Sequence, residues 1–188
     1  MKAPTPDNEA QRLETLRGFG ILDTLPEREF DDLALLASQI CGTPMAMVSL
    51  IDADRQWFKA KIGVAATQTP RDLAFCAHAI LQADLFIIPD ALEDERFLHN
   101  PFVTSDPRIR FYAGAPLLAA DGHALGTLCV LDRVPRELTA KQEESLRALS
   151  RLVVSMLELR RARSDLERLR GMKKLGIKRA PGRAPVSP

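Results

Sequence analysis

Cysteine and histidine supply the most reactive side chains of this 188-residue chain, and each occurs three times. Cys76 lies in a segment that predicts the start of a short helix, where the backbone dipole lowers the pKa of a thiol and favours the thiolate. Such a thiol can sense oxidants, bind a metal or form an adduct. Alternatively, Cys76 is a small core residue packed with Leu73 and Ile80, and burial raises its pKa. Both interpretations fit the sequence.

His78 follows Cys76 by two positions, so on a helix the two side chains point to nearly opposite sides and cannot form a nucleophile and base pair. His99 and His123 show no metal-ligand spacing relative to it, and the chain has no Cys-x-x-Cys motif. We expect His78 to be a hydrogen-bonded structural residue or a pocket wall, Cys129 to be a core residue in a strand, and all thiols to be reduced. No catalytic residue and no metal site is predicted.

A long polar segment, from Asp90 to Arg108, is rich in Asp, Asn and Pro and has little periodicity, which is typical of a functional loop. Asp90 and Asn100 belong to it, and Arg110 and Tyr112 share one face of the strand that follows. These groups can line a pocket, with Arg110 suited to a carboxylate or phosphate. Alternatively, Arg110 pairs with a loop aspartate and fastens the loop to the sheet.

Aromatic residues surround these polar positions, and they are more typical of core packing than of a stacking cage. Together the polar and aromatic positions define the expected ligand pocket. The candidates are Phe75, Cys76, His78, Asp90, Phe97, Asn100, Arg110, Tyr112, Thr127 and Cys129.

Hydrophobic periodicity predicts the elements that position these residues. A first helix starts after Asn8, with Gln11 in the capping-box position, and a second helix runs from Pro26 to Ile40 and ends at Gly42. A final helix opens at a second capping box, formed by Thr139 and Gln142. Strands are predicted at residues 45–52, 55–62, 85–89, 110–119 and 124–132, with hairpin turns at 52–54 and 121–122.

Alternation in residues 55–62 predicts two different faces for that strand. Trp57 lies on the more polar face, which indicates contact with a helix or a partner. The predicted faces are Phe58, Ala60 and Ile62 on one side, and Trp57, Lys59 and Lys61 on the other.

Composition favours one globular domain with a cytoplasmic location, because 46% of the residues are hydrophobic and no apolar run is long enough for a membrane span or a signal peptide. The net charge of +1 conceals an asymmetry, since residues 160–188 hold 10 basic and 2 acidic side chains. This tail lacks aromatic residues that stack on bases, so nucleic-acid binding is not expected. We assign 1–6 to a flexible N-terminus, 7–160 to the domain, and 161–188 to a basic helix end and disordered tail.

Four sequence motifs resemble the GAF sensor domains of bacterial signalling proteins: Arg71 to Ile80 (RDLAFCAHAI), Phe97 to Val103 (FLHNPFV), Arg110 to Leu117 (RFYAGAPL) and Gly126 to Asp132 (GTLCVLD). The resemblance extends from about Asn8 to Arg160 and is densest with the subfamily that precedes histidine kinase, PAS or diguanylate cyclase modules. It implies an α+β fold with a central antiparallel sheet. Terminal helices are expected on one face, and a ligand pocket on the other, roofed by the middle helix and the long loop.

The resemblance also implies a function, that of a sensor that binds a small molecule or senses redox state rather than an enzyme. The signature of cyclic-nucleotide receptors is not recognisable, and Ala77 follows Cys76 where a bilin-binding protein has histidine. The ligand or cofactor is therefore unidentified. One alternative is a small thiol-dependent reductase of free methionine-R-sulfoxide, with paired cysteines drawn from Cys76, Cys129 and Cys41. Another is a structural dimerisation module with a filled pocket.

The final helix carries apolar residues at spacings of three and four, which predicts half of a parallel coiled coil and hence a homodimer. The alternative is that the first part of this helix simply packs on the sheet. In GAF proteins such a helix carries the signal onward, so the resemblance implies a kinase or cyclase partner, in the same chain or another. The seam positions are Leu149, Leu152, Met156, Leu159 and Leu166.

Overall fold

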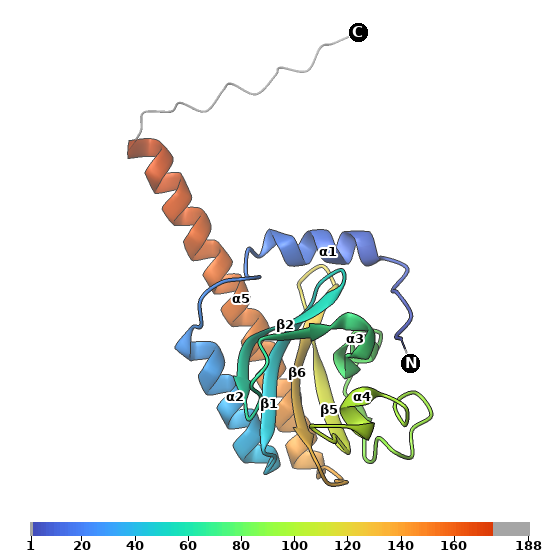
Figure 1. Ribbon diagram of the computed structural model, residues 1–188. Coiled ribbons are helices and arrows are strands. Elements are labelled where there is room, and N and C mark those ends of the chain that lie inside the picture. Colours follow the sequence, from blue (N-terminus) through green and yellow to red (C-terminus); the bar gives the residue numbers. More distant parts are fainter. Residues whose placement is uncertain (1, 175–188) are drawn as a thin grey trace.

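The computed structural model of the protein describes residues 2–174, and these fold into an antiparallel sheet with helices on both faces (Figure 1). The strand order across the sheet is β3-β2-β1-β6-β5-β4. This architecture confirms the predicted α+β class and all five predicted strands, and it adds the short edge strand β3. The strands are β1 (Met45–Ile51), β2 (Arg55–Ile62), β3 (Gln68–Pro70), β4 (Phe86–Ile88), β5 (Phe111–Leu118) and β6 (Ala124–Asp132).

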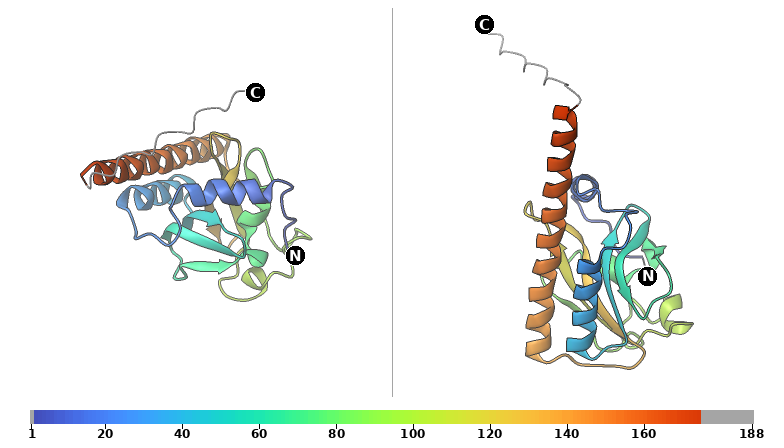
Figure 2. Two further views of the ribbon diagram at one scale, coloured as in Figure 1. Left: turned by 90° about the horizontal axis from the view of Figure 1, so that it is seen from above. Right: turned by 90° about the vertical axis from the view of Figure 1, so that its left-hand side faces the viewer.

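Helices form a layer on each side of the sheet. On one side α2 (Arg28–Cys41) and α5 (Ala140–Lys174) lie side by side, and α1 (Glu9–Gly18) crosses one end of the sheet (Figure 2). On the other side α3 (Phe75–Ala79) and α4 (Pro101–Thr104) form a thinner roof, preceded by the 3-10 turn η1 (Arg71–Leu73). No helix in the range 2–174 is both long enough and apolar enough to cross a membrane.

The central strands β1 and β6 are buried along their entire length, because the sheet is covered on both faces. Their side chains alternate between two hydrophobic cores. Ala46 and Val48 pack against the helices, whereas Met45 and Met47 pack beneath α3 and α4. Strand β1 is therefore a wall shared by two cores.

A β-bulge in β2 corrects the predicted faces of that strand. Val48 pairs with Ala60 and Ser49 with Phe58, which leaves Lys59 as an extra residue. The bulge reverses the alternation, so Trp57 and Ala60 both enter the core beneath the helices, while Phe58 enters the opposite core. The predicted contact of Trp57 with a helix layer is confirmed.

The structure confirms two of the helix-end signals predicted from the sequence and differs from a third. Thr139 and Gln142 form the predicted capping box. The backbone nitrogen of Gln142 donates to Thr139 Oγ1 at 3.3 Å, and the backbone nitrogen of Thr139 donates to Gln142 Oε1 at 2.9 Å. Gly42 ends α2 in the left-handed conformation, at φ 63°. Helix α1 begins directly after Asn8, as predicted, but the predicted capping interaction is wrong, because the Asn8 side chain makes no capping hydrogen bond.

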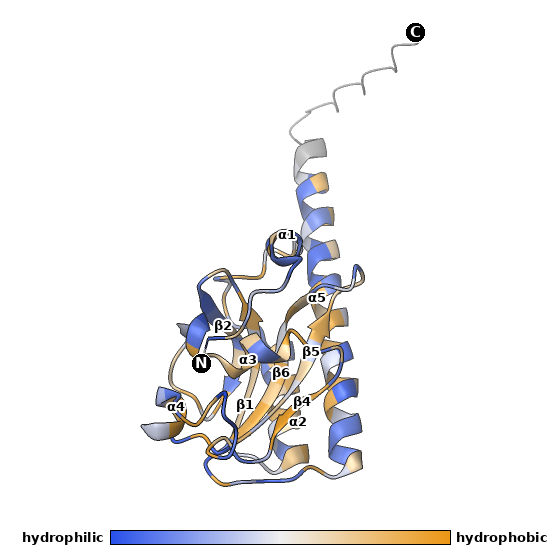
Figure 3. Cartoon of the chain, turned by 90° about the vertical axis from the view of Figure 1, so that its right-hand side faces the viewer, coloured by the Kyte–Doolittle hydropathy of each residue, from blue (hydrophilic) through white to orange (hydrophobic). Residues whose placement is uncertain are grey.

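The predicted coiled-coil seam of α5 is buried in part against the sheet and exposed in part. Leu149 is buried against the sheet together with Leu146 and Val153, and Met156 is partly buried beside them. The outer part of α5 extends beyond the sheet and is largely hydrophilic, with hydrophobic positions at intervals (Figure 3). The exposed leucines of the seam are 52%, 62% and 56% accessible and recur every seven residues, at Leu152, Leu159 and Leu166.

The extra residue of the bulge, Lys59, has a fully buried side chain, and Glu27 supplies its counter-charge. Lys59 Nζ donates to Glu27 Oε1 at 2.7 Å and to the Leu25 carbonyl oxygen at 2.7 Å. Arg160 of α5 donates from Nε to the same Glu27 oxygen at 2.8 Å. One carboxylate thus joins the sheet, the segment before α2 and the long helix. Burial raises the pKa of Glu27, but the hydrogen bonds from Lys59 and Arg160 outweigh it and hold the pKa below 4.5.

We expect Glu27→Ala to lower the free energy of unfolding by about 2 kcal/mol, because it leaves the Lys59 ammonium buried without its counter-charge. Lys59→Met should lower it less, by about 1 kcal/mol, since Met fills the apolar path of the lysine stem and Glu27 keeps Arg160. Urea denaturation at neutral pH measures both, with exposed Glu14→Ala as the control.

The sign of the pH dependence follows from the lowered pKa of Glu27. Its stabilising contribution is complete above pH 4.5 and is lost as the pH falls through the lower folded-state value. The difference between wild type and Glu27→Ala should therefore shrink on acidification. Equal destabilisation by Glu27→Ala and Lys59→Met would contradict this account.

Candidate functional site

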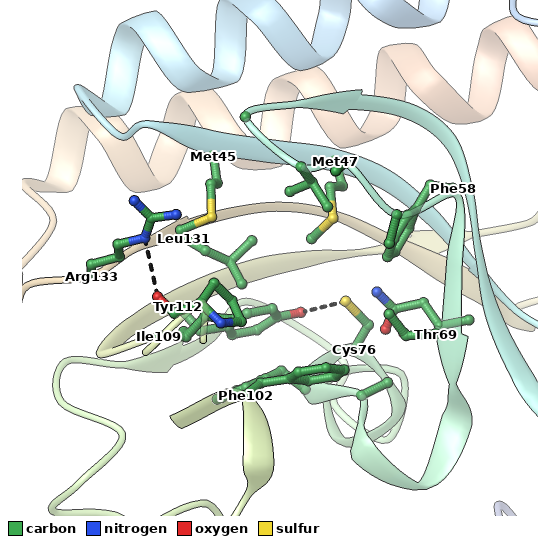
Figure 4. Close-up of a pocket in the computed structure, with 18 of the residues that line it drawn as sticks. Met45, Met47, Phe58, Thr69, Cys76, Phe102, Ile109, Tyr112, Leu131 and Arg133 are labelled. Carbon is green, nitrogen blue, oxygen red and sulfur yellow. Dashed lines mark hydrogen bonds between the residues drawn. The ribbon is translucent and has the colours of Figure 1, made fainter. Parts of the chain in front are cut away.

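A cavity of about 330 Å³ lies between the sheet and the roof of α3 and α4 (Figure 4). Strands β1, β2, β5 and β6 form its floor, and the loop between β2 and β3 together with the segment after α4 form its rim. Most of its walls are apolar and include two flexible methionines that can adapt to the shape of an occupant. The principal wall residues are Met45, Met47, Phe58, Phe102, Ile109 and Leu131.

Two polar side chains in the wall have buried oxygens without a hydrogen-bond partner. They are Gln56 Oε1 and Thr69 Oγ1, the two side-chain atoms in this state among the described residues. Gln56 and Thr69 face each other as a cross-strand pair of β2 and β3, and Gln56 is only 4% exposed. Because an unpaired buried polar atom is destabilising, this wall can accept a hydrogen bond from an occupant of the cavity.

The inner end of the cavity holds two cysteines from different elements. Cys76 of α3 lies with its Sγ 3.7 Å from Cys129 Sγ of β6. Tyr112 donates from its hydroxyl to Cys76 Sγ at 3.3 Å (Figure 4). Cys129 is in turn 3.7 Å from the Met47 carbonyl oxygen. All three cysteines of the chain are free thiols in the structure. The sequence raised this pair only through the reductase alternative, with Cys41 as another possible member, because 53 residues separate Cys76 from Cys129 and give no local signal of their contact.

Hydrogen bonds at this cluster change the ionisation of Cys76. Burial raises the pKa of the Cys76 thiol, but hydrogen bonds from Cys129, Ser49, Thr127 and Tyr112 outweigh burial and bring the pKa below its ordinary value. Burial, followed by the neighbouring sulfur, raises the pKa of Cys129. The burial that one interpretation of Cys76 predicted is confirmed, whereas the role of a sensor thiol stays a prediction.

Glycine at position 114 makes room for this arrangement. A Cβ atom built there would lie 2.1 Å from the Tyr112 hydroxyl oxygen, which no real contact allows. The absence of a side chain on Gly114 therefore lets Tyr112 extend over the neighbouring position of its own strand toward Cys76.

Of the ten predicted pocket residues, Phe75, Cys76 and Tyr112 line the cavity, and Thr127 and Cys129 lie directly behind Cys76. The other five do not line it. Asn100 instead holds the roof together, since its side chain accepts from the Phe102 amide nitrogen at 2.9 Å and donates to the Leu73 carbonyl oxygen at 2.9 Å.

His78 and Phe97 belong to an aromatic cluster outside the cavity, with ring centroids 4.8 Å apart in an edge-on arrangement. Phe97 also stacks on Phe75, at 4.3 Å between centroids. Asp90 and Arg110, the residue before β5, form a two-point ion pair that fastens the loop next to the sheet, which is the alternative that the sequence left open. These four residues do not line the cavity, because packing and pairing occupy their side chains.

Several wall residues were not predicted, although one signal was available. Gln56 precedes Phe58 by two positions, so strand alternation places them on the same face and indicated a polar group among apolar ones. Thr69 lies on β3, a strand too short to show periodicity. Within residues 2–174 no cluster of three or more His, Cys, Asp or Glu side chains could hold a metal ion.

Comparison with known proteins finds a family model and a relative that each match most of this chain. The model of the GAF domain family matches residues 26–157. Over 170 residues the chain is 40% identical to a cyclic di-GMP phosphodiesterase of Pseudomonas aeruginosa, which covers 90% of this chain and 29% of that protein. The chain therefore spans less than a third of that relative's length.

Two solved structures share the fold at low sequence identity. The GAF domain of an Acinetobacter phosphoenolpyruvate-protein phosphotransferase has a TM-score of 0.59 at 16% identity, covering 82% of this chain and 98% of that one. A type II free methionine-R-sulfoxide reductase from Thermoplasma acidophilum has a TM-score of 0.57 at 12% identity, covering 76% and 94%. At these identities the likeness concerns the fold alone.

Proposed function

Because the chain belongs to the GAF domain family, we propose that it is a sensory module that binds a small, largely apolar molecule and has no catalytic activity of its own. The observation that carries the proposal is the cavity of about 330 Å³ with two unpaired polar atoms in its wall. The volume falls at the small end of the range for ligand pockets. We place the protein in the bacterial cytoplasm.

The wall chemistry defines the class of ligand. Its apolar surface selects an apolar body, and Gln56 Oε1 together with the Thr69 hydroxyl select a hydrogen-bond donor, such as a hydroxyl or an N–H group, at one end. A cyclic dinucleotide is a poor fit, because it carries two phosphates and Arg133 is the one cationic side chain among the lining residues. Any connection with cyclic di-GMP therefore lies in the output and not in this cavity.

The output route that the packing favours is α5. The helix contacts β5 and β6, whose other face forms the cavity floor, so a ligand that draws the roof inward changes the surface on which α5 rests. The exposed leucines at seven-residue spacing support a parallel homodimer. The partner would be a cyclic di-GMP enzyme, as the relative's name suggests, or a histidine kinase, in the same chain or another.

A thiol-dependent reductase is the second candidate, and the 3.7 Å separation of Cys76 and Cys129 at the cavity's inner end favours it. We expect no turnover of free methionine-R-sulfoxide by the purified protein with dithiothreitol as reductant. Loss of sulfoxide that persists in Cys41→Ser and disappears in Cys76→Ser would replace the sensory proposal with an enzymatic one.

We expect native mass spectrometry of the protein purified from bacterial cells to show a bound small molecule that is lost on denaturation. Gln56→Leu should weaken its retention about tenfold, because a ligand donor then faces an apolar wall. Gln68→Leu is the matched control, since Gln68 lies on the adjacent strand β3 and does not line the cavity. Absence of any adduct in the wild type, or equal retention by Gln56→Leu, would contradict the proposed site.

We expect the protein to sediment as a dimer and Leu159→Glu to shift it to monomer, because the carboxylate would be buried in the helix seam. Leu92→Glu is the control, as Leu92 is an exposed leucine, 45% accessible, in the loop after β4. Sedimentation equilibrium at micromolar concentration measures both. A monomeric wild type, or a Leu159→Glu variant that stays dimeric, would exclude this interface.

A further inference from the structure

The two thiols at the inner end of the cavity come from opposite sides of it. Cys76 belongs to α3 in the roof, whereas Cys129 belongs to β6 at the centre of the sheet. Their sulfur atoms are 3.7 Å apart. A disulfide requires about 2 Å between sulfurs, so a small movement of the five-residue helix or a rotamer change brings them within bonding distance.

From the cavity, a reagent can reach only one of the two sulfur atoms, and only a small reagent can do so. Cys76 is 1% exposed and lines the cavity, whereas Cys129 is fully buried and does not line it. A reagent must therefore enter the cavity and meet Cys76 first. Hydrogen peroxide, with two heavy atoms, is small enough to do so.

The surroundings favour Cys76 as the attacking atom. Tyr112 donates directly to its sulfur, and Ser49 and Thr127, whose hydroxyl oxygens lie 3.2 Å apart, also stabilise the thiolate. Cys41 provides a contrast within the same chain. It lies in the helix-side core, and burial raises the pKa of its thiol to about 11.

We propose that Cys76 and Cys129 are a peroxide-sensitive dithiol, in which hydroperoxide entering the ligand cavity converts the pair to an intramolecular disulfide. In the first step Cys76 sulfur bonds to one peroxide oxygen, the O–O bond breaks, and the leaving oxygen takes the thiol proton and departs as water. In the second step Cys129 sulfur attacks the Cys76 sulfenic acid, the S–O bond breaks, and the hydroxide leaves as water with the Cys129 proton. Two thiols and one peroxide thus yield one disulfide and two waters.

The disulfide changes the cavity as well as the sulfurs. It ties α3 to β6, so the roof loses its freedom to move relative to the sheet. It also removes the thiolate that accepts the Tyr112 hydrogen bond. Oxidation of the two thiols and binding of a molecule in the cavity are therefore coupled. A bound molecule should slow the oxidation, and the disulfide should in turn change the affinity of the cavity for that molecule. The dithiol reaction itself requires no ligand and goes beyond the ligand-binding proposal.

The test is oxidation of the folded wild-type protein by hydrogen peroxide, followed by catalase, alkylation of free thiols in denaturant, trypsin digestion and mass spectrometry. Trypsin places the three cysteines on separate peptides, because arginines at 71, 96, 110 and 133 bound those of Cys76 and Cys129. Met45 and Met47 in the cavity wall report whether peroxide has entered, since each sulfoxide adds one oxygen.

The expected product is a Cys76–Cys129 linked peptide pair, lighter by two hydrogens than its parts, in both the wild type and Cys41→Ser. Cys76→Ser should give no linked pair. Cys129→Ser should carry one or two extra oxygens on Cys76, and Tyr112→Phe should slow the reaction about fivefold by removing one donor. These outcomes are independent of whether a ligand is ever found.

Three results would overturn the proposal. The first is oxidation of Met45 and Met47 while Cys76 and Cys129 remain fully alkylated, since peroxide would then have reached the cavity without reacting with the pair. The second is protection of the methionines and thiols alike, because the cavity would not admit peroxide. The third is linkage of Cys41 as often as of the other two, which indicates reaction of unfolded chains.

Discussion

The structure depends on a single layer of buried strands that serves two cores at once. Every residue of β1 and β6 is buried, and alternate side chains enter the helix-side core and the cavity-side core. The two strands must also approach closely, since a Cβ atom at position 126 would lie 1.9 Å from the Ser49 carbonyl oxygen. A close-packed wall of this kind transmits displacement from one face to the other instead of absorbing it.

This shared wall explains why the cavity and the long helix can belong to one function. Met47 faces the cavity and its neighbour Val48 faces the helices, so a shift of β1 is felt on both sides. The roof has few elements and little regular structure, whereas the opposite face has three helices. The roof can therefore change its conformation when a molecule binds in the cavity. The helices on the opposite face can transmit that change away from the sheet.

Local signals in the sequence predicted the elements well, because strands, helix ends and turns are encoded by neighbouring residues. The capping box at Thr139 and the turn at Gly122, where φ is 83°, are examples. The bulge at Lys59 was not predictable from alternation, since an extra residue in one strand depends on its pairing with another. The same holds for the candidate site. Phe75 and Tyr112 were found from their motifs, but the pairing of Arg110 with Asp90, which removes both from the cavity, is a tertiary choice between two partners that local sequence allows equally.

The carboxylate of Glu27 also influences the order in which parts of the molecule unfold. It holds two cations, but Lys59 is sealed in the interior while Arg160 retains about a fifth of its side-chain surface in water. The Arg160 side chain can therefore separate from Glu27 without leaving a buried charge unpaired, whereas the Lys59 side chain cannot. In the absence of a partner helix, the outer turns of α5 should open as a local unit at low free energy, ahead of the sheet, so the amide hydrogens of residues 161–174 exchange with solvent independently of global unfolding.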